Sequence, residues 1–216
     1  MRGVNSLPSG RSPARSFRPA RAIVSVLATV RCALRVKVKK AEWVYRGKIF
    51  SVRRDLVVEP RPDRQATRLA AVREVVHHAG SVVLLPVLDD GDILLVCQYR
   101  YTVRRFLWEL PAGRLEAHES PLAAARRELR EETGYTARAW RRLLKLYPTP
   151  GFVNEVMYLY EARSLRPGQA RPEADEAIRA RAFALRTLLR MIERGRLSDA
   201  KSVAGILYYA HHRRAR

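Results

Sequence analysis

Three acidic residues near the middle of the chain are spaced so that they can act together. Glu128 and Glu132 are four residues apart and Glu128 and Glu131 are three apart, so on a helix all three carboxylates share one face. Like charges placed in this way repel, and Arg127 cannot neutralise all three acids. Clustered carboxylate oxygens suit Mg²⁺ or Mn²⁺. The spacing therefore indicates a divalent-metal site, with the solvated face of a surface helix as the alternative.

The residues around these acids carry the signals of a helix over 121–133. Ser120 is a favoured N-cap, and Pro121 takes the first helical position, where its missing N–H is not needed. Gly134 stands where a residue in the left-handed conformation ends a helix. We therefore expect a helix of about three and a half turns that follows a loop opening at 111–113.

The same segment fits a longer motif at every fixed position. The motif reads G-x5-E-x7-R-E-U-x-E-E-x-G-U, with U aliphatic or aromatic, and a chance match is on the order of 10⁻⁷ at ordinary residue frequencies. The matching residues are Gly113, Glu119, Arg127, Glu128, Leu129, Glu131, Glu132, Gly134 and Tyr135. This pattern is the Nudix box, and over about residues 40–212 the chain resembles a Nudix hydrolase.

The resemblance implies a fold, a reaction and a set of residue roles. The fold is of the α/β class, a Nudix-type α/β/α sandwich around a mixed β-sheet. Nudix hydrolases split a nucleoside diphosphate linked to another moiety, and they need Mg²⁺ or Mn²⁺ to neutralise the pyrophosphate and activate a water. By position, the metal ligands are Glu128, Glu132 and the Ala112 carbonyl, with Glu131 assisting and Arg127 orienting the glutamates.

Three stretches outside the box resemble the ADP-ribose pyrophosphatase branch of this family. The stretch 94–116 contains QYR followed by WELPAG, and 147–163 places Pro150 fifteen residues after Tyr135. The third, 172–180, reads PEADEAIRA. The implied reaction is the hydrolysis of ADP-ribose to AMP and ribose 5-phosphate.

In that branch the third stretch is an acidic loop that supplies the general base. Alignment on Ile178 selects Glu176 for this role. Glu173 and Asp175 are alternatives, because the loop is less acidic than is usual in the branch.

Four further residues are candidates for substrate binding. Arg100 can grip a diphosphate, since a guanidinium fits phosphate oxygens bidentately; the alternative is an exposed arginine at a strand end. Arg73 and Glu74 match a stretch that contributes to substrate binding and dimer contact in the branch. Trp43 and its neighbour Tyr45 can stack on adenine, or they can pack in a core or interface.

The branch also implies a homodimer. Its N-terminal strands reach across to a second subunit, so that each active site borrows residues from its partner, and the segment 43–58 supplies such strands here. The alternatives are a Nudix hydrolase acting on another nucleotide sugar or dinucleotide, such as GDP-mannose or NADH, and a non-catalytic ligand sensor.

Composition restricts the class of protein further. The formal charge of +21 permits polyanionic partners, but arginine is spread throughout the chain, so we expect no nucleic-acid partner. The chain has no apolar run of 18 residues, which predicts no membrane-spanning helix. It has only two cysteines, which predicts a reducing, cytoplasmic location. Residues 1–39 form a basic extension that we expect to be disordered, with a targeting peptide and a nucleic-acid-binding arm as alternatives, and 213–216 form a basic tail.

The remaining patterns predict the elements that position these groups. Two apolar runs, 81–88 and 92–99, flank the hairpin-type turn Asp89-Asp90-Gly91, and such dense runs suggest a sheet covered on both faces. Ser198 is a plausible N-cap for the last helix. The other expected elements are a strand–turn–strand at 43–58, strands near 67–77, 139–147, 154–162 and 177–184, and helices near 185–195 and 199–212.

Overall fold

The computed structural model describes residues 36–59, 69–170 and 178–214. The chain divides into two units, Met1–Arg35 and Val36–Arg216, and only the second contains described residues. Most of the expected N-terminal extension and all three candidates for the general base, Glu173, Asp175 and Glu176, therefore lie outside the described residues. No helix within the described ranges is both long and apolar enough to cross a bilayer.

The described residues form strands and helices that interleave along the chain. The strands are β1 (Lys37–Arg46), β2 (Phe50–Glu59), β3 (Leu69–His78), β4 (Ser81–Pro86), β5 (Ile93–Arg100), β6 (Arg105–Glu109), β7 (Ala112–Arg114), β8 (Thr136–Leu146), β9 (Met157–Arg166) and β10 (Arg179–Phe183). The helices are η1 (Tyr101–Val103), α1 (Pro121–Thr133), α2 (Leu185–Glu193) and α3 (Ala200–Arg214). Residues 37–39, which the sequence placed in the extension, form the start of β1.

The strands pair into three sheets. An antiparallel sheet has the order β1-β2-β3, a second has the order β10-β5-β6, and a mixed sheet has the order β7-β4-β9-β8. In the mixed sheet β4 runs parallel to β9, whereas β7 and β8 are antiparallel to their neighbours. The predicted mixed sheet is therefore present.

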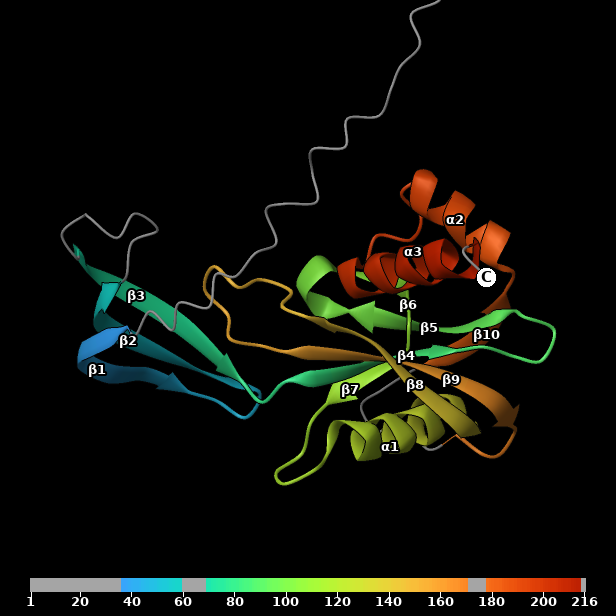
Figure 1. The fold of residues 1–216 in the computed structure, drawn as a ribbon, viewed down its shortest axis with the longest axis horizontal. Helices are drawn as coiled ribbons and strands as arrows, with labels where there is room; N and C mark the ends of the chain where they lie inside the picture. The colour runs from blue at the N-terminus through green and yellow to red at the C-terminus, as the bar shows by residue number, and fades with distance from the viewer. Residues whose placement is uncertain (1–35, 60–68, 171–177, 215–216) are drawn as a thin grey trace, which may run out of the picture. The chain divides into compact units, whose positions relative to one another are not determined.

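Strand β4 separates two hydrophobic clusters. All six of its residues are buried, and neighbouring side chains of a strand point to opposite faces. Val82 and Leu84 pack in the cluster that contains residues of α1, while Val83 and Leu85 pack in the cluster that contains residues of α2 and α3. The helices thus cover opposite faces, as Figure 1 shows, and the predicted α/β/α arrangement is confirmed.

The turn predicted at Asp89-Asp90-Gly91 is present, but the two strands beside it do not form a hairpin ladder. Leu88 N–H donates to Asp92 and Gly91 has a φ of 90°. Pairing stops at a single bridge between Val87 and Ile93, after which β4 and β5 enter different sheets. The two edges of β4 pair with β7 and β9 instead.

The helix that carries the acids has the predicted bounds, Pro121–Thr133. The Ser120 side chain accepts a hydrogen bond from the Ala123 N–H at 3.2 Å, and Gly134 ends the helix with a φ of 76°. A side chain at Gly134 would be strained, and its Cβ would lie 2.6 Å from the Ala170 nitrogen. Local capping chemistry therefore fixes both ends of α1.

The N-cap expected for the last helix is wrong by one residue. The helix begins at Ala200, and the Asp199 carboxylate accepts a hydrogen bond from the Ser202 N–H at 3.0 Å. Asp199 also pairs with Lys201 at 3.0 Å. The cap is therefore Asp199, since its carboxylate meets partners on the first turn of α3, whereas Ser198 is exposed.

Replacing the cap should destabilise the protein. We expect Asp199→Ala to lower the free energy of unfolding by about 1 kcal/mol, because the Ser202 N–H loses its acceptor. Ser198→Ala should change it by less than about 0.5 kcal/mol, as expected for an exposed position. Urea unfolding of both variants measures the difference, and equal losses would return the capping role to Ser198.

Candidate active site

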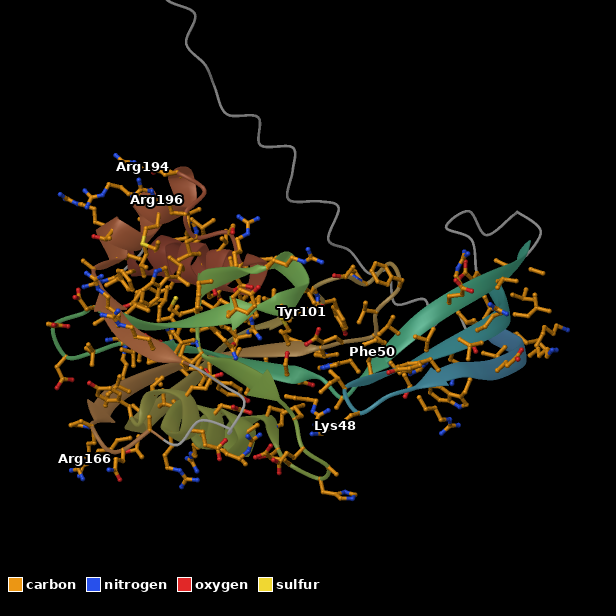
Figure 2. The ribbon with its side chains drawn as sticks, turned by 180° about the vertical axis from the view of Figure 1, so that it is seen from behind. Lys48, Phe50, Tyr101, Arg166, Arg194 and Arg196 are labelled. Atoms are coloured by element: carbon orange, nitrogen blue, oxygen red, sulfur yellow. The ribbon has the colours of Figure 1, made fainter. Side chains whose placement is uncertain are left out.

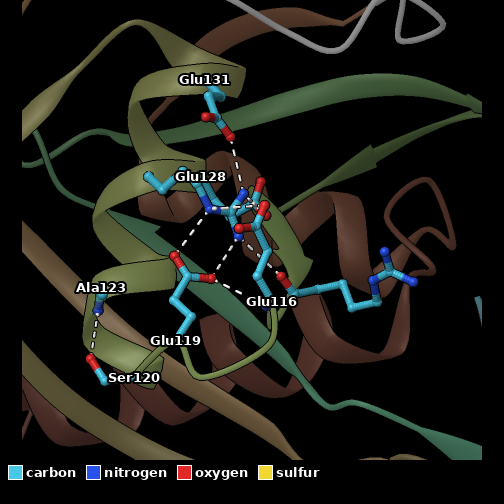
Figure 3. A network of polar contacts seen from close by, with 8 residues as sticks. Glu116, Glu119, Ser120, Ala123, Glu128 and Glu131 are labelled. Atoms are coloured by element: carbon cyan, nitrogen blue, oxygen red, sulfur yellow. Dashed lines mark hydrogen bonds and ion pairs between the residues drawn. The ribbon is translucent and has the colours of Figure 1, made fainter.

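Arg127 of α1 lies among four carboxylates (Figure 3). The distances from its guanidinium nitrogens to the nearest carboxylate oxygens are 2.7 Å for Glu128, 2.9 Å for Glu119, 3.1 Å for Glu131 and 3.8 Å for Glu116. The hydrogen bond that Arg127 donates to Glu119 is the largest cause that raises the pKa of Arg127, against the opposing effect of burial. The arginine therefore stays charged and holds the acids in place.

The same guanidinium connects the helix to strand β7. Its Nη2 group donates to the Arg114 carbonyl at 3.1 Å. At the other end of β7, the Ala112 N–H donates to the Glu132 carboxylate at 3.1 Å. Both ends of β7 are thus bonded to groups of α1.

Gly113 lets the loop approach the helix closely. A Cβ at this position would lie 1.9 Å from the carboxyl carbon of Glu128, a distance that no side chain allows. A side chain at this position would force the Glu128 carboxylate to move, so the glycine lets that carboxylate lie against β7.

The carboxylates border a cavity of about 300 Å³. Its lining contains Ala112, Arg127, Glu128, Glu131 and Arg100, which the sequence singled out. The lining also contains Ile49, His78, Gly113, Arg114 and Glu116. The structure thus gathers most of the predicted metal and phosphate groups in one place, with Glu132 bonded to Ala112 at its border.

These oxygens are chemically suited to hold a divalent cation. Glu128 and Glu132 are buried, and a magnesium ion is commonly held by one or two carboxylates together with phosphate oxygens. Within the described ranges no three acidic, histidine or cysteine side chains come together as a complete metal site. Two buried carboxylates are enough for an ion whose other ligands are phosphate oxygens and waters.

Arg100 borders the cavity but is also held by another residue. Its Nε and Nη2 groups each donate to the Glu109 carboxylate at 2.8 Å. The hydrogen bond to Glu109 raises the pKa of Arg100 against the opposing effect of burial, and the charges of Glu109, Glu132 and Asp199 raise it further. Arg100 is the last residue of β5 and its side chain is 40% exposed, as the alternative of an exposed arginine at a strand end predicted, but the ion pair with Glu109 fixes its position.

The other predicted substrate-binding residues lie elsewhere in this chain. Arg73 pairs with Glu59 at 2.6 Å and Glu74 with Arg54 at 3.1 Å, and both line a second cavity of about 270 Å³ that includes Pro150. The Trp43 ring lies 4.9 Å from the His77 ring, with Arg46 and Arg53 nearby. Within one chain these residues do not meet the carboxylates.

His78 is a cavity residue that the sequence reasoning missed. Its Nδ1 atom accepts a hydrogen bond from the Gly80 N–H at 3.1 Å and lies 3.6 Å from Glu155. Its position at the end of β3, two residues before a glycine, was the available signal. Glu109 was also missed, because nothing in the pattern WELPAG says which partner the acid binds.

The fold and the cavity together define a class. A mixed sheet between helical layers, with a loop and a helix that collect carboxylates around one arginine, is the arrangement of Nudix-type proteins. The family model described as NUDIX domain matches residues 76–205, and the chain belongs to this family. Nudix hydrolases generally depend on divalent metal ions.

Curated relatives and a solved structure agree with this assignment. The chain is 35% identical to "ADP-ribose pyrophosphatase" of Bacillus subtilis, over 82% of this chain and 93% of the relative. It is 40% identical to "ADP-ribose pyrophosphatase" of Mycobacterium tuberculosis, over 77% of this chain and 79% of the relative. A crystal structure of an "ADP compounds hydrolase" superposes with a TM-score of 0.72 at 20% identity, covering 85% of this chain and 97% of that one, which supports the fold.

The acid cluster should make stability depend on pH. The hydrogen bonds from Arg127 lower the pKa of Glu119, so its contribution is present above the ordinary value of about 4.3 and is lost as the pH falls through the lowered value. We expect the free energy of unfolding to fall between about pH 5 and pH 3, and Glu119→Gln to reduce this slope. Urea unfolding at several pH values measures both; identical slopes would contradict the pairing.

Proposed function

We propose that this protein hydrolyses the pyrophosphate bond of nucleoside diphosphate sugars, with ADP-ribose giving AMP and ribose 5-phosphate. The observation that carries the proposal is the cavity where Glu128 and Glu131 of α1 lie beside Arg100. Acids that bind a cation and an arginine that binds phosphate meet there. The names of the two curated relatives favour ADP-ribose over other sugars.

The chemistry of the substrate explains why the acids are needed. A pyrophosphate resists hydroxide because its negative oxygens repel the nucleophile. Bound Mg²⁺, or Mn²⁺ in its place, neutralises this charge, orients a water and lowers the pKa of that water. In the proposal Glu128, Glu132 and the Ala112 carbonyl hold the ion, and Glu131 assists.

The other groups position the ions, the substrate and the proton. Arg127 orients the carboxylates of Glu128 and Glu131 through the ion pairs described above. Arg100 binds the diphosphate by charge-assisted hydrogen bonds. Glu176 takes the proton from the attacking water as general base, a role proposed from the family resemblance of its loop.

A second copy of the chain completes the site in this proposal. One face of the β1-β2-β3 sheet exposes Tyr45, Phe50, Leu56 and Val72, and paired residues such as Leu56 and Val72 share a face. Figure 2 shows Phe50 beside Lys48, at the turn between β1 and β2. An exposed apolar face of this kind favours association, and we propose a homodimer.

In such a dimer, the residues that lie away from the carboxylates of their own chain would contribute to the active site of the partner chain. Trp43 would stack on the base, and Arg73 and Glu74 would contact substrate or partner. Nucleic acid is not a proposed partner, because exposed arginines are spread over separate parts of the fold: Arg166 ends β9, whereas Arg194 and Arg196 lie together in the turn after α2 (Figure 2). The proposed location is the cytoplasm.

The proposed reaction predicts an order of substrate preference and a loss of turnover when a metal ligand is replaced. Purified protein with Mg²⁺ should convert ADP-ribose to AMP and ribose 5-phosphate faster than it hydrolyses GDP-mannose or NADH. Glu132→Gln should lower turnover by about 10²-fold or more, as expected when a group that stabilises charge is removed. Chromatography of the nucleotide products measures both results.

The matched control is an acid outside the cavity. Glu193 is exposed on α2 and lines a different cavity, so Glu193→Gln should keep turnover within about twofold. Full activity of Glu132→Gln would remove the metal-ligand assignment. Preferred hydrolysis of GDP-mannose or NADH would move the proposal to another substrate.

The dimer predicts that a charge on the exposed apolar face is harmful. Val72→Asp should give a monomer with poor activity, because burying an unpaired carboxylate in an interface is costly. Leu207→Asp, at an exposed position of α3, should leave both size and activity unchanged. Light scattering and turnover measure the outcome, and a fully active wild-type monomer would refute the shared site.

A further inference from the structure

We infer that Glu109 is a positioning residue for the proposed hydrolysis: it fixes the guanidinium of Arg100 at the border of the cavity, in the orientation that receives the diphosphate. The inference rests on the proposed function and extends it to a residue outside the Nudix box. Glu109 is not among the residues that line the cavity, so it acts through Arg100.

The first observation is the depth at which the carboxylate lies. Glu109 is 2% exposed at the end of β6, a position at which an ionised acid needs strong partners. Burial favours the neutral form of Glu109, but the bonds and charges of Arg100 and Lys201 outweigh it and lower its pKa. The carboxylate therefore stays ionised through two cations that approach it from different elements, β5 and α3.

The second observation is the geometry of the Arg100 pair. Both bonds to Glu109 are 2.8 Å long and engage Nε and Nη2, the side-on arrangement that fixes the plane of the guanidinium. Nη1 takes part in neither bond, and a guanidinium has five N–H donors in total. The pair thus orients the arginine while donors stay available for phosphate oxygens at the cavity.

The third observation is how firmly the acid itself is held. Lys201, 10% exposed in its side chain, bonds the Oε2 atom of Glu109 and pairs with Asp199, the cap of α3. The neighbouring Leu110 N–H donates to the buried Ser202 hydroxyl at 2.7 Å. The end of β6 is therefore attached to the first turn of α3 at two adjacent residues, which gives Arg100 a rigid support.

Without Glu109, the Arg100 side chain could pair with the carboxylates of α1 instead. The charge of Glu132 already acts on the pKa of Arg100, so a guanidinium released from Glu109 would be drawn to the acids that hold the cation. Pairing with Glu109 keeps it at the border instead. The energetic role of Glu109 is pre-organisation, which affects substrate binding more than the chemical step.

The chain offers a matched control in Glu161. This acid of β9 is also buried and also bonds two cations, Arg141 and Arg163. It lines a separate cavity with them. Changing Glu161 to glutamine therefore removes the same charge from a similar environment without touching Arg100.

The test compares Glu109→Gln with Glu161→Gln in the full-length protein. We expect Glu109→Gln to raise the KM for ADP-ribose about tenfold or more, the loss expected for one oriented charge pair, with kcat within about threefold and an unchanged Mg²⁺ requirement. Glu161→Gln should keep KM within about twofold. In an Arg100→Ala background, Glu109→Gln should add less than about twofold, because the two residues act as one unit.

Three results would overturn the inference: an unchanged KM in Glu109→Gln, an equal rise in Glu161→Gln, or full additivity with Arg100→Ala. If Glu109→Gln fails to fold, Glu109→Asp, which keeps the charge on a shorter side chain, should raise KM to a smaller extent, and an unchanged KM would again refute the role.

Calorimetric binding of ADP with Mg²⁺ separates this test from the proposed function. A wild-type protein that binds ADP but hydrolyses no nucleotide sugar overturns the proposed function. In that case the inference predicts that Glu109→Gln binds ADP about tenfold more weakly than the wild type does. A wild-type protein that binds no nucleotide overturns both.

Discussion

The arrangement at α1 depends on one guanidinium among several carboxylates. Glu128 and Glu131 lie on one helix face and would repel each other without a cation between them. Arg127 bonds both, as well as Glu119 at the start of the helix. Because the same side chain bonds the Arg114 carbonyl, the attraction that keeps the acids together also fixes the helix to the sheet.

This constraint also explains why the cluster suits a cation-dependent reaction. Arg127 contributes one positive charge, whereas four carboxylates contact it and Glu132 lies one residue beyond. Arg100 and Arg114 also line this cavity, and Arg100 is already paired with Glu109. In the proposed function, the negative charge that remains would attract a divalent cation, which would arrive with its anionic substrate.

The sequence predicts best what short-range chemistry decides. The ends of α1 follow from Ser120, Pro121 and Gly134, whose effects do not require the rest of the chain. The cap of α3 was misplaced because Ser198 and Asp199 are both good caps, and the choice depends on contacts to Lys201 and Ser202. Propensity alone does not distinguish two adjacent capping residues.

Pairing between distant segments is harder to predict for a physical reason. A turn at 89–91 is read correctly from its residues, yet β4 and β5 separate, because each pairs with strands from distant parts of the chain, β4 with β9 and β5 with β10. The bond between Arg100 and Glu109 likewise depends on the register of β5 and β6, which pairs Val96 with Glu109. A shift of one residue would turn the acid to the other face of the sheet.

The segment 109–113 shows how the two helical layers act on one site. Its first residues are bonded to α3, through Glu109 to Lys201 and through the Leu110 N–H to Ser202. The Pro111 carbonyl then accepts a hydrogen bond from Leu84 of β4.

The last residues of this segment belong to the opposite side of the sheet. The Ala112 N–H bonds Glu132, and Gly113 lies against the Glu128 carboxylate. Five consecutive residues therefore connect α3, the central strand and α1 through one short length of backbone. Since this backbone touches both the support of Arg100 and the carboxylates of α1, a displacement of α3 would alter the spacing between the group proposed to bind phosphate and the groups proposed to bind the cation. In the proposed function, that spacing would depend on the packing of both helical layers as well as on the motif.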